Sequence, residues 1–140
     1  MKNKILVSMI LCLSSVISAS AFAATPSAKG TEIYIISPAD GDTVSSPVTV
    51  QFGLKGMGVA PAGVDKPNTG HHHLIIDADA PDMSKPIPKN DHYRHFGGGQ
   101  TEASLDLKPG KHTLQLLLGD KEHMSFNPPV LSKKITITVK

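Results

Sequence analysis

Proline and glycine interrupt this chain so often that only short segments remain in which a regular element could form. The 140 residues include 12 glycines and 11 prolines, and no stretch between them shows the apolar repeat of an amphipathic helix. The apolar segments are short, rich in β-branched residues and bounded by turn residues. Residues 48–54 alternate apolar and polar side chains strictly, as a half-buried strand does. The pattern predicts an all-β fold.

The spacing of these segments narrows the architecture. Seven segments have the length and composition of strands: 32–36, 48–54, 71–77, a short irregular one between residues 83 and 95, 103–107, 112–118 and 134–139. Short strands at this spacing predict an antiparallel β-sandwich of the immunoglobulin-like type. A small barrel or a jelly roll is the main alternative. Because the cysteine pair and the tryptophan of antibody domains are missing, only the architecture is predicted.

The first 23 residues have the organisation of a secretory signal peptide. Two lysines precede an apolar run over residues 5–16, and the small residues Ala21 and Ala23 provide the pattern that a signal peptidase needs. We therefore expect a signal peptide over residues 1–23, a flexible leader over 24–30 and the immunoglobulin-like domain over 31–140. The expected location of the protein is the periplasm.

Loss of the signal peptide would change the composition in two ways. The single cysteine, Cys12, lies within it, so the exported protein would hold no thiolate ligand, no cysteine nucleophile and no disulfide. Removal of Lys2 and Lys4 lowers the formal net charge from +2 to 0. No block of basic residues remains to bind nucleic acid, and no second apolar run is long enough to insert into a membrane.

Three consecutive histidines begin the most unusual of the predicted strands. Residues 70–77 read GHHHLIID, which suggests a strand that begins exposed to solvent and ends buried. Because side chains alternate across a strand, His71 and His73 share one face and His72 lies on the other. At most two of the three can therefore act together.

The predicted topology brings histidines from distant segments to one end of the sandwich. Three loops of such a fold emerge at the same pole, and they carry His71, His95 and His123, with Asp120 close to His123 in sequence. His112 belongs at the opposite pole. Imidazoles and a carboxylate together bind copper or zinc well. The predicted metal ligands are His71, His73, His95, His123 and Asp120.

Several motifs of this chain resemble those of a family of bacterial exported proteins that carry a domain of unknown function. The motifs are GHHHLIID at residues 70–77, HFGGGQTE at 95–102 and PGKHTLQLLLGD at 109–120. The resemblance covers roughly residues 31 to 139, which is nearly all of the predicted domain. It implies membership of that family, but it implies no activity, cofactor or site residue.

One function is expected from these features, and two alternatives stay open. We expect a periplasmic, non-enzymatic module that binds copper or zinc through the predicted histidines, with Asp120 or Asp77 either as a carboxylate ligand or as a hydrogen-bond partner of a ligand. In the first alternative the chain is an envelope domain that binds protein or glycan, and its histidines form a structural hydrogen-bond network. In the second it is an enzyme, either a metal hydrolase or a superoxide-type catalyst. The sequence does not decide whether the protein is a monomer or an oligomer.

Overall fold

The structure, a computed structural model, describes residues 24–140. The predicted signal peptide lies outside the described residues. Within 24–140 the chain forms strands and no helix, so none of these residues belongs to a helix that could cross a membrane. The strands are β1 (Glu32–Ser37), β2 (Thr43–Val44), β3 (Val48–Lys55), β4 (Gly58–Val59), β5 (Thr69–Ile76), β6 (Tyr93–His95), β7 (Glu102–Leu105), β8 (Gly110–Gly119) and β9 (Ile135–Val139).

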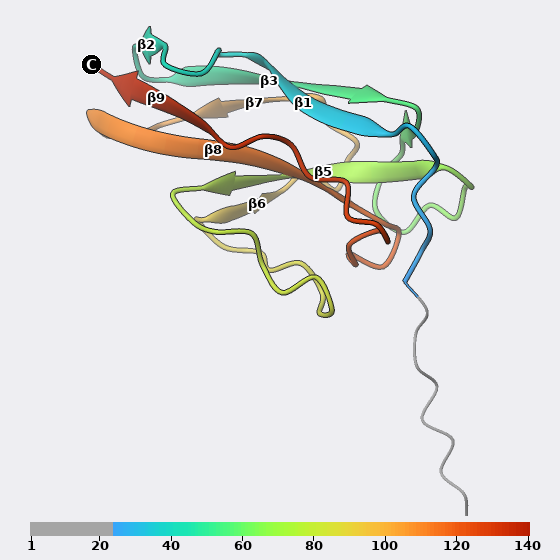
Figure 1. The fold of residues 1–140 in the computed structure, drawn as a ribbon. Coiled ribbons are helices and arrows are strands. Elements are labelled where there is room, and N and C mark those ends of the chain that lie inside the picture. Colours follow the sequence, from blue (N-terminus) through green and yellow to red (C-terminus); the bar gives the residue numbers. More distant parts are fainter. Residues whose placement is uncertain (1–23) are drawn as a thin grey trace, which may run out of the picture.

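The strands form two sheets that face each other (Figure 1). One sheet has the order β1-β3-β7. The other has the order β2-β9-β8-β5-β4, with β6 paired to β5. Neighbours are antiparallel except for the two-residue strands β2 and β4, which pair in parallel with β9 and β5. The predicted all-β immunoglobulin-like sandwich is confirmed, and the strand count rises from about seven to nine because β2 and β4 add to the predicted set.

The irregular strand predicted between residues 83 and 95 is shorter than expected. Within residues 83–95, only Tyr93–His95 form a strand, which pairs with β5, and residues 77–92 form a loop. Proline explains part of this, because Pro81, Pro86 and Pro88 have no backbone N–H to donate to a neighbouring strand. The short strand still has a large consequence, because it places His95 directly opposite His73.

The main core fills the space between the two sheets. It includes Val50 and Phe52 from β3 and Leu74, Leu116 and Ile137 from the facing sheet, all of them buried. These positions alternate along their strands, as the period of two predicts. Each such side chain stabilises the fold by about 1.5–3 kcal/mol.

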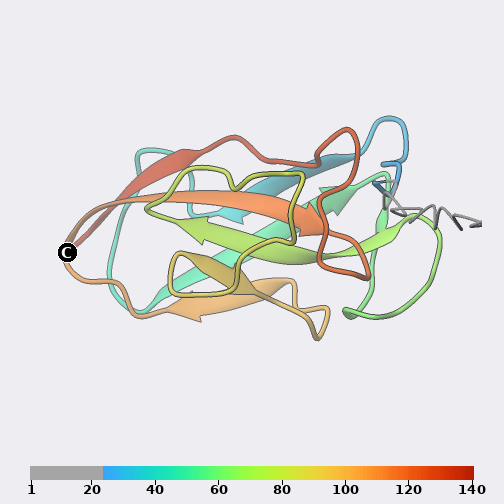
Figure 2. The ribbon, with the colours of Figure 1, turned by 90° about the horizontal axis from the view of Figure 1, so that it is seen from below.

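A second, smaller core lies on the other face of β5 and β8. Ile75, Ile87 and Leu117 form it. Two connections, residues 77–92 and 120–134, cover this face (Figure 2). A hydrogen bond of 2.7 Å from the Ile87 amide to the His123 carbonyl joins the two connections.

The covering loops correct one prediction about the histidine strand. The strand was expected to begin exposed, but His71, His72 and His73 have exposed fractions of only 1%, 0% and 1%. The sequence pattern describes the strand alone, whereas burial here depends on loops that fold back from elsewhere in the chain. The predicted separation of the faces is correct: His72 packs on Phe52 in the main core, while His71 and His73 lie under the loops.

Candidate metal centre

Four histidines from three segments meet on the covered face of the sheet. His71 and His73 come from β5, His95 ends β6, and His123 lies in the connection after β8. One potential ligand atom from each of His71, His95 and His123 lies within 4.8 Å of those of the other two. The ring of His73 lies beside this group, with its centroid 4.8 Å from that of His71 and 5.1 Å from that of His95.

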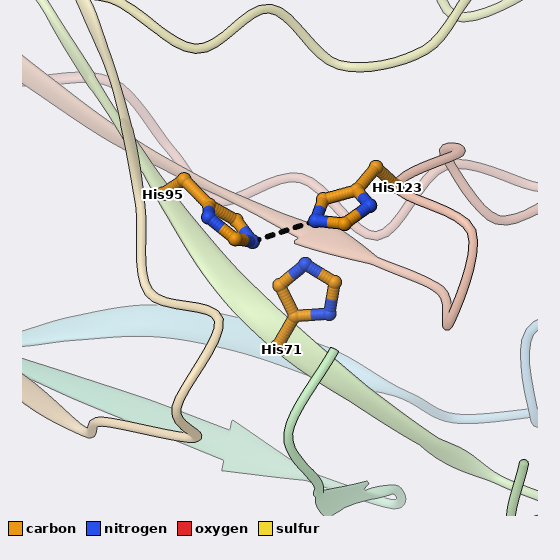
Figure 3. Close-up of side chains that lie close together, drawn as sticks. All are labelled: His71, His95 and His123. Atoms are coloured by element: carbon orange, nitrogen blue, oxygen red, sulfur yellow. Dashed lines mark hydrogen bonds between the residues drawn. The ribbon is translucent and has the colours of Figure 1, made fainter. Parts of the chain in front are cut away.

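Two of these rings are joined by a hydrogen bond. The Nε2 atoms of His95 and His123 lie 2.8 Å apart, so one of them donates and the other accepts. The His71 ring, which comes from β5, points toward this pair, as Figure 3 shows. Three ring nitrogens thus converge on one point, which is the arrangement that a metal ion with imidazole ligands requires.

The ring nitrogens of the two β5 histidines in the cluster have no hydrogen-bond partner within residues 24–140. Both ring nitrogens of His71 and both of His73 are buried without a hydrogen-bond partner in the described part of the chain. Burial lowers the pKa of His71 to about 4, and the nearby His123 and His95 rings lower it further in the same direction. Burial also lowers the pKa of His73 to about 3, with a smaller contribution from His71. Both rings are therefore neutral near pH 7, and the neutral ring is the form that binds a metal ion.

Asp120 lies near the cluster but has a different set of partners. One carboxylate oxygen accepts hydrogen bonds of 2.9 Å from the amides of Glu122 and Met124. The other accepts a hydrogen bond of 2.6 Å from the Thr25 hydroxyl. The structure thus leaves Asp120 outside the three-histidine group, because both of its oxygens hold the loop in place.

This loop fixes His123 in an uncommon backbone conformation. Its φ angle is +63°, in the left-handed region that few residues other than glycine and asparagine occupy. The amide of His123 donates to the carbonyl of Asp120 over 3.1 Å. The predicted leader contributes as well, because Ser27 donates its amide to the Asn127 carbonyl. The position of His123 therefore depends on a loop that several hydrogen bonds hold.

Two glycines make room for the imidazoles. A Cβ atom on Gly97 would lie 2.3 Å from the His95 ring, and one on Gly119 would lie 2.6 Å from the His73 ring. Real Cβ atoms do not approach so closely, so each glycine permits the observed ring position. Gly97 belongs to a glycine run that is visible in the sequence, but the sequence does not reveal which of its members contacts a ring.

The remaining candidates lie at the other end of β5. Asp77 accepts a hydrogen bond of 2.8 Å from the Thr113 amide and pairs with the His112 ring at 2.6 Å. Burial alone would lower the pKa of His112, but its bonds to Asp77 and to the Lys108 carbonyl raise it overall. Asp77 is therefore not the carboxylate partner of the cluster. The expected exclusion of His112 from the cluster agrees with the structure.

Comparison with known proteins identifies one family. A family model described as Domain of unknown function (DUF4399) matches residues 50–140. This region contains all four clustered histidines, and the match agrees with the resemblance seen in the sequence. No curated protein and no solved structure matches the chain significantly.

Proposed function

This chain belongs to the family of the Domain of unknown function (DUF4399), and we propose that it is a non-enzymatic module that binds one copper or zinc ion through His71, His95 and His123. Neutral imidazole is a good ligand for both ions. With residues 1–23 as a signal peptide, the module acts in the periplasm, where it acquires its ion after export.

One observation carries this proposal. His71 is buried with neither ring nitrogen paired within residues 24–140, yet two further imidazoles present ligand atoms within 4.8 Å of its own. A buried polar atom without a partner costs about 1–3 kcal/mol of stability. In native proteins such an atom is therefore nearly always satisfied by another group, such as a hydrogen-bond partner, a water molecule or an ion. A metal ion between the three rings would satisfy one of the two His71 nitrogens, and the pKa of His71 near 4 keeps that ring free of a competing proton.

The alternative of a structural network draws support from one contact only. The hydrogen bond between His95 and His123 would stabilise the loops without any ion, in a domain that binds envelope protein or glycan. Such a network gives no partner to His71 or His73. The network therefore leaves unpaired the His71 nitrogen that a metal ion would bind, which makes the network the weaker explanation of the cluster.

Titration calorimetry of the metal-free protein with Zn(II) and Cu(II) tests the proposal. We expect one ion per chain with a dissociation constant below about 1 μM, which corresponds to roughly 8 kcal/mol. At a free-ion concentration of 100 times that constant, the free energy of unfolding should rise by about 2.7 kcal/mol. A chelator should reverse the rise. The proposal would be contradicted if the protein bound either ion no more tightly than a single surface histidine does and if the ion did not raise the free energy of unfolding.

Substitution of Gly97 by alanine should weaken metal binding while leaving every histidine in the chain. The added Cβ would lie 2.3 Å from one His95 ring atom and 2.8 Å from Nε2, so the ring must move. A shift of a ligand out of position should lower the affinity by about 10-fold or more, as measured by competition with a chromogenic chelator.

The neighbouring glycine provides the matched control. The atoms nearest to a Cβ on Gly98 belong to the end of the flexible Gln100 side chain, at 2.9 Å or more, and this side chain can turn away at the cost of its hydrogen bond with the Gly98 amide. Gly98→Ala should therefore bind the ion like the unmodified protein. Equal affinity in both variants would show that the position of the His95 ring does not matter for binding.

A further inference from the structure

His73 lies beside the three proposed ligands, although within residues 24–140 only His71, His95 and His123 present ligand atoms that all lie within 4.8 Å of one another. It follows His71 on the same face of β5 and pairs with His95 in the register of β5 and β6. Both of its ring nitrogens are buried, and neither has a partner among the described residues. His73 shares this feature with His71 and His72, but of the other two only His71 lies on the same face, at a distance of 4.8 Å between the ring centroids of His71 and His73.

The separations of the four rings can be compared with those of a tetrahedral site. With metal–nitrogen bonds of about 2.0 Å, each ring centroid lies about 3 Å from the ion, and tetrahedral ligands then have centroids about 5 Å apart. The three separations among His71, His95 and His123 are 5.0, 5.0 and 4.5 Å. The separations of His73 from these rings are 4.8, 5.1 and 6.2 Å, the longest being to His123.

Burial alone does not explain this arrangement. His72 is equally buried on the same strand, but its ring faces the main core and lies 5.1 Å from Phe52. His73 instead has three imidazoles around it and a glycine beside it, since a Cβ on Gly119 would approach its ring to 2.6 Å. The backbone leaves space for an imidazole at this point, next to three other imidazoles.

We propose that His73 is the fourth ligand and that four imidazoles enclose the ion. This inference rests on the proposed function. Zinc sites with four protein ligands are structural, whereas catalytic zinc sites keep one position open for water or substrate. A site closed by His71, His73, His95 and His123 has no such open position. The module then holds its ion as a structural or stored metal and does not activate a water molecule on it.

Replacement of the ion by Co(II) tests the coordination number, because the visible spectrum of Co(II) changes with its geometry. In the unmodified protein we expect the intense bands of a four-coordinate ion, unchanged when azide or free imidazole is added. His73→Ala should bind Co(II) about 10-fold more weakly or worse. Its spectrum should shift when azide or imidazole enters the opened position.

Two further variants keep the test decisive. His73→Leu fills the space without a ligand atom and should also lose affinity, while His72→Leu, on the opposite face, should retain the spectrum of the unmodified protein. Thermal unfolding of each metal-free variant verifies that it folds. A shift of the unmodified protein's spectrum with azide, or full affinity in both His73 variants, would overturn the four-ligand site and leave the three-histidine site standing. Absence of any Co(II), Zn(II) or Cu(II) binding would overturn both proposals.

Discussion

Substitution of His123 by asparagine is expected to lower the affinity for Zn(II) or Cu(II) by about 100-fold. Structural zinc sites with four ligands bind with roughly 10–16 kcal/mol, so one ligand accounts for about 3 kcal/mol of the total. Asparagine is preferred to alanine here because it tolerates the left-handed backbone at this position, where φ is +63°. The loss can be measured by calorimetry or by chelator competition.

The matched control for this variant is His112→Asn. His112 is also a histidine held by hydrogen bonds, but its partners are Asp77 and the Lys108 carbonyl at the other end of β5. Its loss removes an imidazole from the protein without touching the cluster, so metal affinity should not change. If both variants bound the ion equally well, whether tightly or weakly, His123 would not be a ligand.

The gathering of histidines was predictable from the sequence because strand alternation and sandwich connectivity are simple rules. The period of two places His71 and His73 together and separates them from His72. The order of the strands then brings segments around residues 95 and 123 toward the same part of the fold. In the structure, ligand atoms of His71, His95 and His123 lie within 4.8 Å of one another, as this reasoning predicts.

Several details of the site follow from contacts that the strand pattern does not encode. The histidines were expected at loop tips, but His71 and His95 lie on strands, under the connections over residues 77–92 and 120–134, whereas His123 lies in one of these connections. Asp120 was expected to bind the ion, but its oxygens hold backbone amides and Thr25. Similarly, the role of Gly97 depends on the direction of one ring. The covering connections and the Thr25 bond join residues far apart in the chain, whereas the Gly97 contact and the amide bonds of Asp120 are local but depend on the conformation of each loop.

Acidification should destabilise the metal-free protein strongly between pH 6.5 and about 4. Burial lowers the pKa of His72 from 6.5 to about 4, and His71 and His73 shift in the same direction. Below pH 6.5 the unfolded chain takes up protons that the folded chain does not, so the unfolded state gains stability as the pH falls. The stabilisation from these rings is fully present above pH 6.5. For His72 alone the loss at pH 5 is about 2 kcal/mol.

Urea unfolding of the metal-free protein at pH 7.5, 6.0 and 5.0 measures the loss in the free energy of unfolding. Two other titratable residues must be considered when this loss is attributed to the buried histidines. His112 acts in the opposite sense, because its raised pKa adds stability as the pH falls, so the observed loss is a net value. Asp82, whose pKa is lowered to about 2 by its bonds to Ser84 and Lys85, loses its contribution only below pH 4, outside the measured window.

His72→Leu separates the contribution of one ring from those of the cluster. Leucine removes two buried nitrogens that have no partner within residues 24–140 and keeps apolar contact with Phe52. The variant should therefore be at least as stable as the unmodified protein at pH 7.5, and it should lose about 2 kcal/mol less on going to pH 5. An unchanged pH dependence would mean that His72 takes up a proton in the folded state, and that its burial does not keep the ring neutral. Since His71 and His73 are buried to the same degree on the same strand, their neutrality in the metal-free protein would then need a direct measurement by NMR titration.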